Sequence, residues 1–195
     1  ACFSGLETDE KINLGNAIRY FGDGFQISKK LNDKKFWRIP VMEGEFVIED
    51  KTSITSGIGG GNILIIGTSN KEVLKAGEAA VKEMKKIDNI ILPFPGGIVR
   101  SGSKVGSKYK NLIASTNDAY CPTLKGITKT NLDKDIECVL EIVVDGINEK
   151  DIALAMKKGI SIICKKFNKG IKSISAGNYG GKLGPFHFHL RDIMK

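Results

Sequence analysis

Residues 138–146 are Cys138-Val139-Leu140-Glu141-Ile142-Val143-Val144-Asp145-Gly146, a run typical of a buried β-strand with a carboxylate at its centre. Successive side chains of a strand point to opposite faces. One face therefore carries an unbroken apolar set, suited to packing against helices, and the other places Glu141 between two valines. Because a charge among apolar neighbours is costly, Glu141 must meet water, be paired or have a function.

The segments on both sides of this strand follow one pattern. Asn70 and Asn148 can each cap a helix with apolar residues at helical spacing. The expected order is a strand at Ile63–Gly67, a helix at Lys71–Lys86, a strand at Ile90–Leu92, the strand quoted above, a helix from Asn148 to about Phe167, and a strand at Ile171–Ser175. Two such β-α-β units predict an α+β fold, a ferredoxin-like α/β sandwich (β-α-β-β-α-β with extra strands) with both helices on one face of the sheet.

Further strands are expected outside these units. They are Leu14–Phe21, Phe36–Val41, Glu45–Ile54 and Phe186–Leu190. Pro40 favours an edge strand or an irregular link, because proline cannot donate to a strand ladder. Residues 93–130 form a long segment, and its aromatic residues and prolines favour an ordered, functional loop.

Composition places the chain among soluble globular proteins. It has 195 residues, 41% hydrophobic and 27% charged, which is enough for one large domain or two small ones. No apolar run reaches the ~20 residues of a membrane span and no signal peptide opens the chain, so we expect a cytoplasmic protein. The net charge of +8 comes mostly from scattered lysines, which indicates a solvated surface, and we expect no membrane or nucleic-acid partner.

Metal and redox sites are not expected. The four cysteines, Cys2, Cys121, Cys138 and Cys164, form no Cys-x-x-Cys pair, and the last two lie in apolar segments, where a free thiol behaves as a small hydrophobe. His187 and His189 share one face of their expected strand, but no further His or Cys cluster accompanies them. We therefore expect no metal, and an interface or solvent role for both histidines.

Two glycine-rich stretches do not predict phosphate loops. A strand, not a helix, follows Gly57–Asn62, so we expect its glycines to allow a bend or close backbone packing. The stretch Gly177–Lys182 has the wrong spacing and precedes Pro185. Its glycines fit a tight turn, which either brings backbone N–H groups to a ligand or has no ligand at all.

Glu141 itself allows two interpretations. If the second face of the sheet is in contact with solvent, Glu141 is an ordinary surface residue, as on many antiparallel sheets. If that face lines a cleft or a subunit contact, apolar neighbours would raise the pKa of its carboxyl, which would suit a proton shuttle near neutral pH.

Longer stretches resemble the formylmethanofuran:tetrahydromethanopterin formyltransferase family. They are Phe21–Gly24, Ile39–Val41 with Glu43–Phe46, Pro93–Val99, Ser103–Lys108, Ala114–Pro122, and Ser175–Asn178 with Gly180–Gly184. The likeness covers nearly the whole chain after about residue 14. The family has a further N-terminal lobe, so this chain is similar to its C-terminal portion. Residues 1–40 would then be a remnant of the first lobe with a connector, and residues 41–195 the C-terminal ferredoxin-like lobe.

The resemblance implies a cytoplasmic homo-oligomer, a tetramer or dimer of dimers, that acts in methanogenesis or formaldehyde oxidation. Family members move a formyl group between the amine of methanofuran and N5 of tetrahydromethanopterin. Both coenzymes are substrates, and no metal or prosthetic group is used. The site is expected at lobe and subunit contacts.

The resemblance also assigns residues. The family's catalytic glutamate corresponds to Glu141, which would take a proton from the attacking amine and return one to the leaving nitrogen. Apart from this carried-over residue, we expect the reaction to need donors to the oxyanion and cationic side chains that meet the anionic coenzymes. The substrate-binding residues that we expect are Gly96, Gly97, Ser103, Lys104, Ser115, Asn117, Asp118, Asn178 and Lys182.

Two alternatives to the enzyme stay open. The first is a non-catalytic ligand-binding module or a subunit of a formyltransferase/hydrolase complex. The second is a basic RNA-binding ferredoxin-like domain, which a steep dependence of binding on salt would identify.

Overall fold

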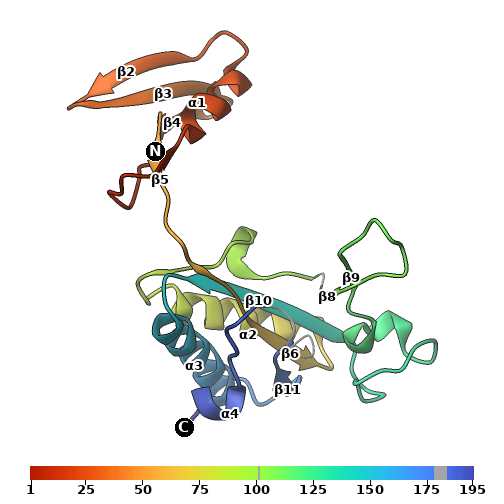
Figure 1. Ribbon diagram of the computed structural model, residues 1–195. Helices are drawn as coiled ribbons and strands as arrows, with labels where there is room; N and C mark the ends of the chain where they lie inside the picture. The colour runs from red at the N-terminus through yellow and green to blue at the C-terminus, as the bar shows by residue number, and fades with distance from the viewer. Residues whose placement is uncertain (101, 178–183) are drawn as a thin grey trace. The chain divides into compact units, whose positions relative to one another are not determined.

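The computed structural model describes residues 1–100, 102–177 and 184–195 (Figure 1). By its internal contacts the chain divides into two compact units, Ala1–Ser56 and Gly57–Lys195. The lobe boundary that we expect between residues 40 and 41 stays a prediction.

The first unit is built on a three-stranded antiparallel sheet. Its order is β2-β3-β4, formed by β2 (Ile27–Leu31), β3 (Lys34–Val41) and β4 (Gly44–Glu49). The short strands β1 (Lys11–Ile12) and β5 (Thr52–Ser53) pair separately. Its buried apolar side chains are Phe36, Ile39 and Ile48.

Pro40 lies in the central strand of this sheet, so the expectation of an edge strand is wrong. β2 pairs with β3 only from Lys34 to Arg38, whereas β4 continues to Val41. Pro40 therefore lies beyond the last residue paired with β2, where one side of β3 has no partner and the missing N–H is tolerated.

The strand expected at Leu14–Phe21 is also wrong. Leu14–Ile18 forms α1, and Arg19–Gly22 forms the 3₁₀ helix η1. Leu14, Ala17 and Ile18 have the i, i+3, i+4 spacing of one helix face, a signal that outweighs the β-propensity of the aromatic residues that follow.

The second unit contains a four-stranded antiparallel sheet of order β11-β6-β10-β7. Its elements are, in chain order, β6 (Ile58–Gly67), α2 (Asn70–Met84), β7 (Ile90–Ile91), β10 (Cys138–Gly146), α3 (Glu149–Lys166) and β11 (Ile171–Ser175). The predicted mixed α/β architecture is confirmed. In Figure 1, α2 and α3 lie side by side against the sheet.

The helices bury their apolar faces on one face of this sheet. Leu140, Ile142 and Val144 of β10 point into this core, as the alternation in the sequence predicts. The helices contribute Val73, Ala76, Ala80, Val81, Met84, Ile152, Ala155, Met156, Ile160 and Ile163. Each fully buried aliphatic side chain contributes about 1.5–3 kcal/mol, so this cluster supplies most of the unit's hydrophobic stabilisation.

The opposite face of the sheet is covered rather than bare. Leu64 and Ile66 of β6 pack there with Leu132 and Ile136, which precede β10. Of the four side chains that β10 presents to this face, Glu141 is buried and the other three are half-buried.

The glycines before Ile63 belong to β6, which begins at Ile58 rather than at Ile63. A Cβ at Gly61 would lie 2.8 Å from side-chain atoms of both Ile152 and Val144. The expected close packing is confirmed at this position, because only glycine lets α3 approach the strand so closely.

The two long helices begin at different kinds of cap. Ser69, not Asn70, caps α2, and its Oγ accepts a long hydrogen bond of 3.4 Å from the Glu72 N–H. Asn148 caps α3 as predicted, with its Oδ1 accepting from the Asp151 N–H at 2.9 Å.

Short elements order the long segment at residues 93–130, as predicted. They are the 3₁₀ helices η2 (Pro95–Gly97), η3 (Asp118–Tyr120) and η4 (Pro122–Leu124) and the strands β8 (Ser103–Val105) and β9 (Ala114–Thr116). β8 and β9 pair antiparallel, with Lys104 opposite Ser115.

The strand expected at Phe186–Leu190 is wrong. Residues 186–189 pair with no strand in the part of the chain that the structure describes, and Leu190–Ile193 forms α4. Phe188 and Leu190 pack against the helix-side core without a backbone ladder, so their alternation reflects burial and not pairing. Cys164 is exposed although its segment is apolar. No helix in the described ranges is long and apolar enough to cross a membrane.

Candidate active site

Glu141 lies in the middle of β10 on the sheet face opposite the two helices. Its residue surface is only 5% exposed, and it stands opposite Leu64 of β6. On its other side Glu141 exchanges both backbone hydrogen bonds with Val99, at 2.8 and 2.9 Å. The strand is therefore paired on both sides at this residue, which fixes the backbone from which the Glu141 side chain extends.

A cavity of about 280 Å³ lies beside this carboxyl. Its walls come from β6, β10, the segment that follows Val99, and η3 with the residues next to it. The lining includes Arg100, Gly102, Asn117, Tyr120 and Cys121. The interpretation of Glu141 as an ordinary surface residue is therefore wrong, because these residues cover this face.

The environment of Glu141 changes its acidity. Burial raises the pKa of its carboxyl above that of an exposed glutamate, and the hydrogen bond from Asn62 opposes this shift only in part. The direction is the one expected for a carboxyl surrounded by apolar side chains. A carboxyl of raised pKa exchanges protons more readily near neutral pH.

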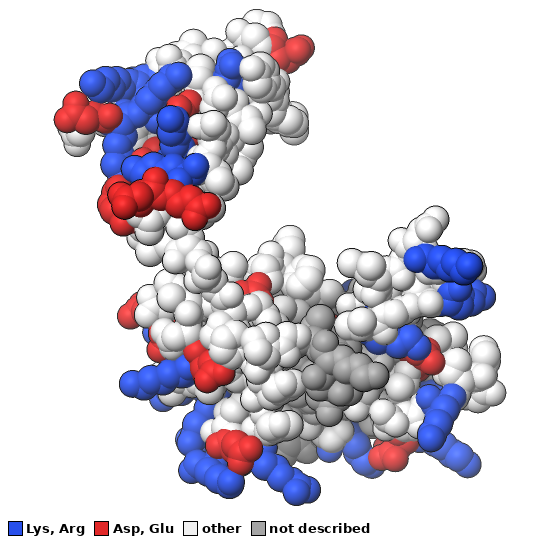
Figure 2. Space-filling view, in the orientation of Figure 1, with Lys and Arg blue, Asp and Glu red and all other residues white. Residues whose placement is uncertain are grey.

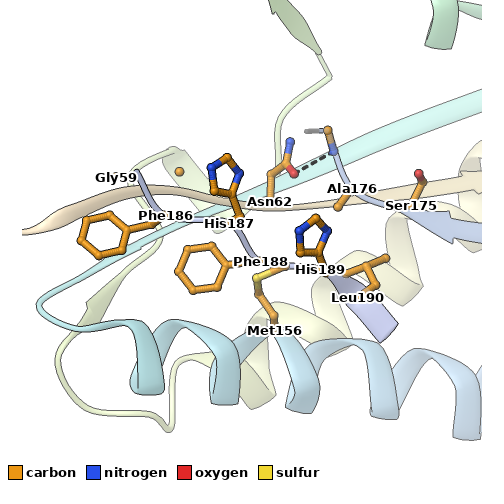
Figure 3. Close-up of a pocket in the computed structure, with 12 residues that line it drawn as sticks. Gly59, Asn62, Met156, Ser175, Ala176, Phe186, His187, Phe188, His189 and Leu190 are labelled. Atoms are coloured by element: carbon orange, nitrogen blue, oxygen red, sulfur yellow. Dashed lines mark hydrogen bonds between the residues drawn. The ribbon is translucent and has the colours of Figure 1, made fainter. Parts of the chain in front are cut away.

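Asn62 of β6 contacts this carboxyl directly. Its Nδ2 donates to Glu141 Oε1 at 2.8 Å, and its Oδ1 accepts from the Gly177 N–H at 2.9 Å. Asn62 is 6% exposed and points toward the segment that follows β11 (Figure 3). Glu141 is thus connected to the backbone at Gly177 through one side chain.

A second cavity, of about 250 Å³, lies on the other side of Asn62. His187 and His189 line it, with ring centroids 6.3 Å apart and nearly parallel planes, together with Phe186 and Phe188 (Figure 3). The described residues contain no group of three or more His, Cys, Asp or Glu side chains that could hold a metal ion.

A third, open depression lies at the β8–β9 hairpin. Lys104 forms an ion pair with Asp118, and this contact lowers the pKa of the Asp118 carboxyl. Ser115 also lines the depression, and its hydroxyl donates to the Gly106 carbonyl at 2.8 Å. Thr116 lines both this depression and the Glu141 cavity, so the two are neighbours.

On the face of the second unit that Figure 2 shows, Lys and Arg side chains lie at several separate places, with Asp and Glu between them. This distribution agrees with the scattered lysines of the sequence.

Two family descriptions match the chain. "FTR, proximal lobe" matches residues 44–193, and "Formylmethanofuran-tetrahydromethanopterin formyltransferase" matches residues 1–41. The chain belongs to the formylmethanofuran-tetrahydromethanopterin formyltransferase family. The resemblance predicted from its longer stretches is confirmed.

Named relatives in this formyltransferase family are highly similar. The chain is 60% identical over its whole length to the formylmethanofuran–tetrahydromethanopterin formyltransferase of Methylobacillus flagellatus, and covers 66% of that protein. It is 48% identical to one subunit of the formyltransferase/hydrolase complex of Methylorubrum extorquens, and covers 65% of that subunit. The chain thus spans about two thirds of the length of the curated relatives it matches.

Solved structures of the family are also similar to this chain. One is the formyltransferase/hydrolase complex (FhcABCD) from Methylorubrum extorquens in complex with methylofuran, at a TM-score of 0.73 and 48% identity, covering 99% of this chain and 65% of that one. Another is the formyltransferase from Methanosarcina barkeri, at a TM-score of 0.73 and 42% identity, covering 98% of this chain and 65% of that one.

The structure brings together some of the catalytic and substrate-binding residues expected for a member of this formyltransferase family. Glu141 and Asn117 line one cavity, and Lys104, Ser115 and Asp118 line the adjoining depression. Ser103 is exposed at the start of β8 and lines neither. Asn178 and Lys182 lie outside the described residues.

Gly96 and Gly97 lie apart from these cavities in η2. The Gly97 N–H donates to the Phe94 carbonyl at 2.8 Å. A Cβ at Gly97 would lie 2.9 Å from the side chain of Val81, so this turn packs against α2.

Sequence reasoning missed Asn62, Arg100 and Tyr120 as neighbours of Glu141. Asn62 is the one polar side chain in the apolar run from Ile58 to Gly67, and this was the sequence signal that could have indicated a functional residue there. Its position opposite Val143 follows only from the register of β6 with β10. No local pattern places Arg100 or Tyr120 there.

Proposed function

We propose that the chain carries the proton-transfer site of a formyltransferase that moves a formyl group between formylmethanofuran and N5 of tetrahydromethanopterin. The observation that carries this proposal is the buried Glu141 carboxyl of raised pKa beside a cavity. Membership in the formyltransferase family and the relatives' names supply the reaction and the substrates. The protein would then be an acyltransferase of one-carbon metabolism, in methanogenesis or formaldehyde oxidation.

Formyl transfer between two nitrogens needs one group that both accepts and donates a proton. The attacking amine loses a proton as the tetrahedral carbon forms, and the leaving nitrogen must gain one as it collapses. Glu141 can do both in turn, because its carboxyl is neutral or ionised at accessible pH. An apolar wall, which includes Leu64 and Val139, limits competing exchange with water.

The proposed substrate-binding residues have unequal support. Asn117 lies in the Glu141 cavity, where its side chain could donate to the developing oxyanion. Lys104, Ser115 and Asp118 are proposed to meet a coenzyme in the adjoining depression. Gly96, Gly97 and Ser103 are proposed as substrate-binding residues but line neither the Glu141 cavity nor the adjoining depression. Asn178 and Lys182 are proposed from the sequence alone, because they lie outside the described residues.

The finer arrangement of the fold belongs to the same proposal. The element order β6-α2-β7-β10-α3-β11 and the sheet order β11-β6-β10-β7 support a ferredoxin-like lobe. We assign residues 41–195 to this lobe and residues 1–40 to a connector and the remnant of the other lobe. A cytoplasmic location and a homo-oligomer, a tetramer or dimer of dimers, complete the proposal.

Replacing Glu141 by glutamine tests the function. Glutamine keeps the side-chain shape and can still accept from Asn62, but it cannot exchange a proton. In the full-length protein we expect Glu141→Gln to lower kcat by about 10²–10⁴-fold, the usual contribution of a positioned acid–base group, with KM changed much less. A spectroscopic assay of formyl transfer measures both.

The matched control is Glu49→Gln. Glu49 is also buried, at 7% exposed, but it lies in the first unit, where it accepts from the Ser4 N–H at 2.9 Å. We expect this variant to keep the wild-type kcat. A Glu141→Gln enzyme with the same kcat as Glu49→Gln would contradict the proposal.

A second candidate function is the role of subunit in a formyltransferase/hydrolase complex. It is favoured by the 48% identity to one subunit of such a complex and by the structure of that assembly. The subunit composition of the protein purified from its source separates the two. A single chain type indicates the homo-oligomer, and several co-purifying chain types indicate the complex.

A further inference from the structure

We propose that Asn62 is a positioning residue, which holds the Glu141 carboxyl so that Oε2 and not Oε1 exchanges protons with the substrate. The proposal rests on the proposed function of Glu141 and adds to it the orientation of the carboxyl. It is carried by two hydrogen bonds of one buried amide, Asn62 Nδ2 to Glu141 Oε1 at 2.8 Å and the Gly177 N–H to Asn62 Oδ1 at 2.9 Å.

The orientation of the Asn62 amide is determined by its partners. A backbone N–H can only donate, so the atom that it meets must be the carbonyl oxygen Oδ1. The NH₂ group then necessarily faces Glu141. A flipped amide would place an N–H₂ group against the Gly177 N–H and an oxygen against the carboxyl, and both contacts would be lost.

This orientation makes the two oxygens of Glu141 different. An NH₂ group can only donate, so Glu141 Oε1 stays an acceptor whether the carboxyl is ionised or neutral. The carbonyl oxygen of a neutral carboxyl is a better acceptor than its hydroxyl oxygen, so the Asn62 amide favours Oε1 as the carbonyl oxygen and the proton on Oε2. A Cβ built on Gly102 would lie 3.9 Å from Oε2, and Gly102 and Glu141 line the same cavity, so Oε2 is the oxygen next to this cavity wall.

Burial makes the arrangement stiff. Asn62 is 6% exposed and Glu141 5% exposed, and β6 and β10 are paired at both residues. A buried amide that loses one partner has an unsatisfied polar group, so the alternative orientations are costly. Asn62 also lines the His187 cavity, and this links the carboxyl to the segment at Ser175–Gly177.

Other ionisable side chains lie near Glu141. Those that line its cavity are Arg100, Tyr120 and Cys121, and those beyond Asn62 are His187 and His189. Only Asn62 forms a hydrogen bond to the Glu141 carboxyl among the described residues. A titration that shifts when Asn62 is substituted, and that is missing from Glu141→Gln, therefore belongs to the Glu141 carboxyl.

The test uses Asn62→Leu and Asn62→Asp in the full-length protein. Leucine has a similar volume and donates nothing. Aspartate can still accept from the Gly177 N–H, but it presents an oxygen to Glu141. We expect kcat to fall by about 10²-fold in Asn62→Leu, the loss typical of a misplaced reacting group, with little change in KM. In both variants the limb of the kcat–pH profile that reports Glu141 should move to higher pH.

A second readout is independent of activity. The titration of Glu141 is followed by NMR with ¹³C-labelled glutamate carboxyls and identified by its absence in Glu141→Gln. We expect it to move to higher pH in both Asn62 variants and to stay unchanged in the control Ile66→Val, which alters the same face of β6 outside the cavity.

The outcomes separate the two proposals. If Glu141→Gln is inactive but Asn62→Leu keeps the wild-type kcat, pH profile and Glu141 titration, the positioning role is wrong and the proposed function stands. If Glu141→Gln stays fully active, the proposed function is wrong, and with it the role of Asn62 in catalysis. An equal shift of the titration in Ile66→Val would also overturn the positioning role, since it would show a general loosening of the strand.

Discussion

At the scale of single residues, Glu141 combines a chemical role with a cost in stability. Its burial raises the pKa of the carboxyl, which means that ionisation of the folded protein is unfavourable compared with ionisation of the unfolded chain. The hydrogen bond from Asn62 reduces this cost without removing it. Such a cost is common where a polar group is retained for function.

Glu141→Gln is accordingly expected to raise the free energy of unfolding at pH 7. The folded-state pKa lies above the unfolded-state value of about 4.3. Between the two values the folded protein binds more protons than the unfolded chain, so wild-type stability falls as the pH rises through this window. The variant has no such loss, and its advantage should grow from near zero below about pH 4 to a plateau above the folded-state pKa. Urea denaturation over this pH range measures it.

Glu49→Gln again serves as the control for this measurement. The Glu49 carboxylate forms an ion pair with Lys34 at 3.4 Å and accepts from the Ser4 N–H. Glutamine can still accept from the Ser4 N–H but loses the ion pair with Lys34, so stability should fall at pH 7. A Glu141→Gln variant that loses stability in the same way would contradict the unfavourable ionisation of Glu141.

At the scale of elements, the two long helices begin with caps of different quality. Asn148 Oδ1 accepts from the Asp151 N–H at 2.9 Å, and its Nδ2 donates to the Asp151 carboxylate at 2.8 Å. Ser69 Oγ accepts from the Glu72 N–H at 3.4 Å, near the limit of a hydrogen bond. The start of α3 is therefore held more firmly than that of α2.

Alanine substitutions at the caps should show this difference. Asn148→Ala is expected to lower the free energy of unfolding by about 1 kcal/mol, the typical loss of an N-cap, and Ser69→Ala by less. The midpoint of urea denaturation measures both, with the slope unchanged. A larger loss in Ser69→Ala would show that the hydrogen-bond length at these caps does not predict their strength.

At the scale of the whole molecule, the two units differ in the size of their apolar cores. Residues 57–195 contain both apolar clusters, on the two faces of the four-stranded sheet. The buried apolar side chains of residues 1–56 are only Phe36, Ile39 and Ile48, and the unit exposes large apolar side chains such as Phe21, Phe25 and Met42. A unit of this size with so small a core is marginal by itself.

The fragment 57–195 is therefore expected to fold alone, whereas 1–56 is not. The expected result is cooperative urea unfolding and a dispersed NMR spectrum for 57–195, and neither for 1–56. A native-like spectrum of 1–56 alone would contradict the prediction. The fragment 57–195 should also show the raised pKa of Glu141, because each described residue that touches its carboxyl or lines its cavity lies within this unit.

The sequence was most informative where one local pattern had a single interpretation. The β10 run, the helices at α2 and α3 and the cap Asn148 follow from alternation, helical spacing and capping chemistry. The sequence was misleading where one pattern is compatible with a strand and also with another structure. Phe186–Leu190 alternates because Phe188 and Leu190 are half-buried against the helix-side core, and Leu14–Phe21 contains both a helical spacing and β-favouring aromatic residues.

By itself, the sequence determined that β10 has one apolar face and carries Glu141 on the other, and its longer stretches determined the family. Only the tertiary structure decided that this other face is covered, that burial raises the pKa of the carboxyl, and that Asn62 holds it. The physical reason is distance along the chain. Asn62, Arg100 and Tyr120 reach Glu141 through strand register and loop packing, and neither is encoded in the local spacing of side chains.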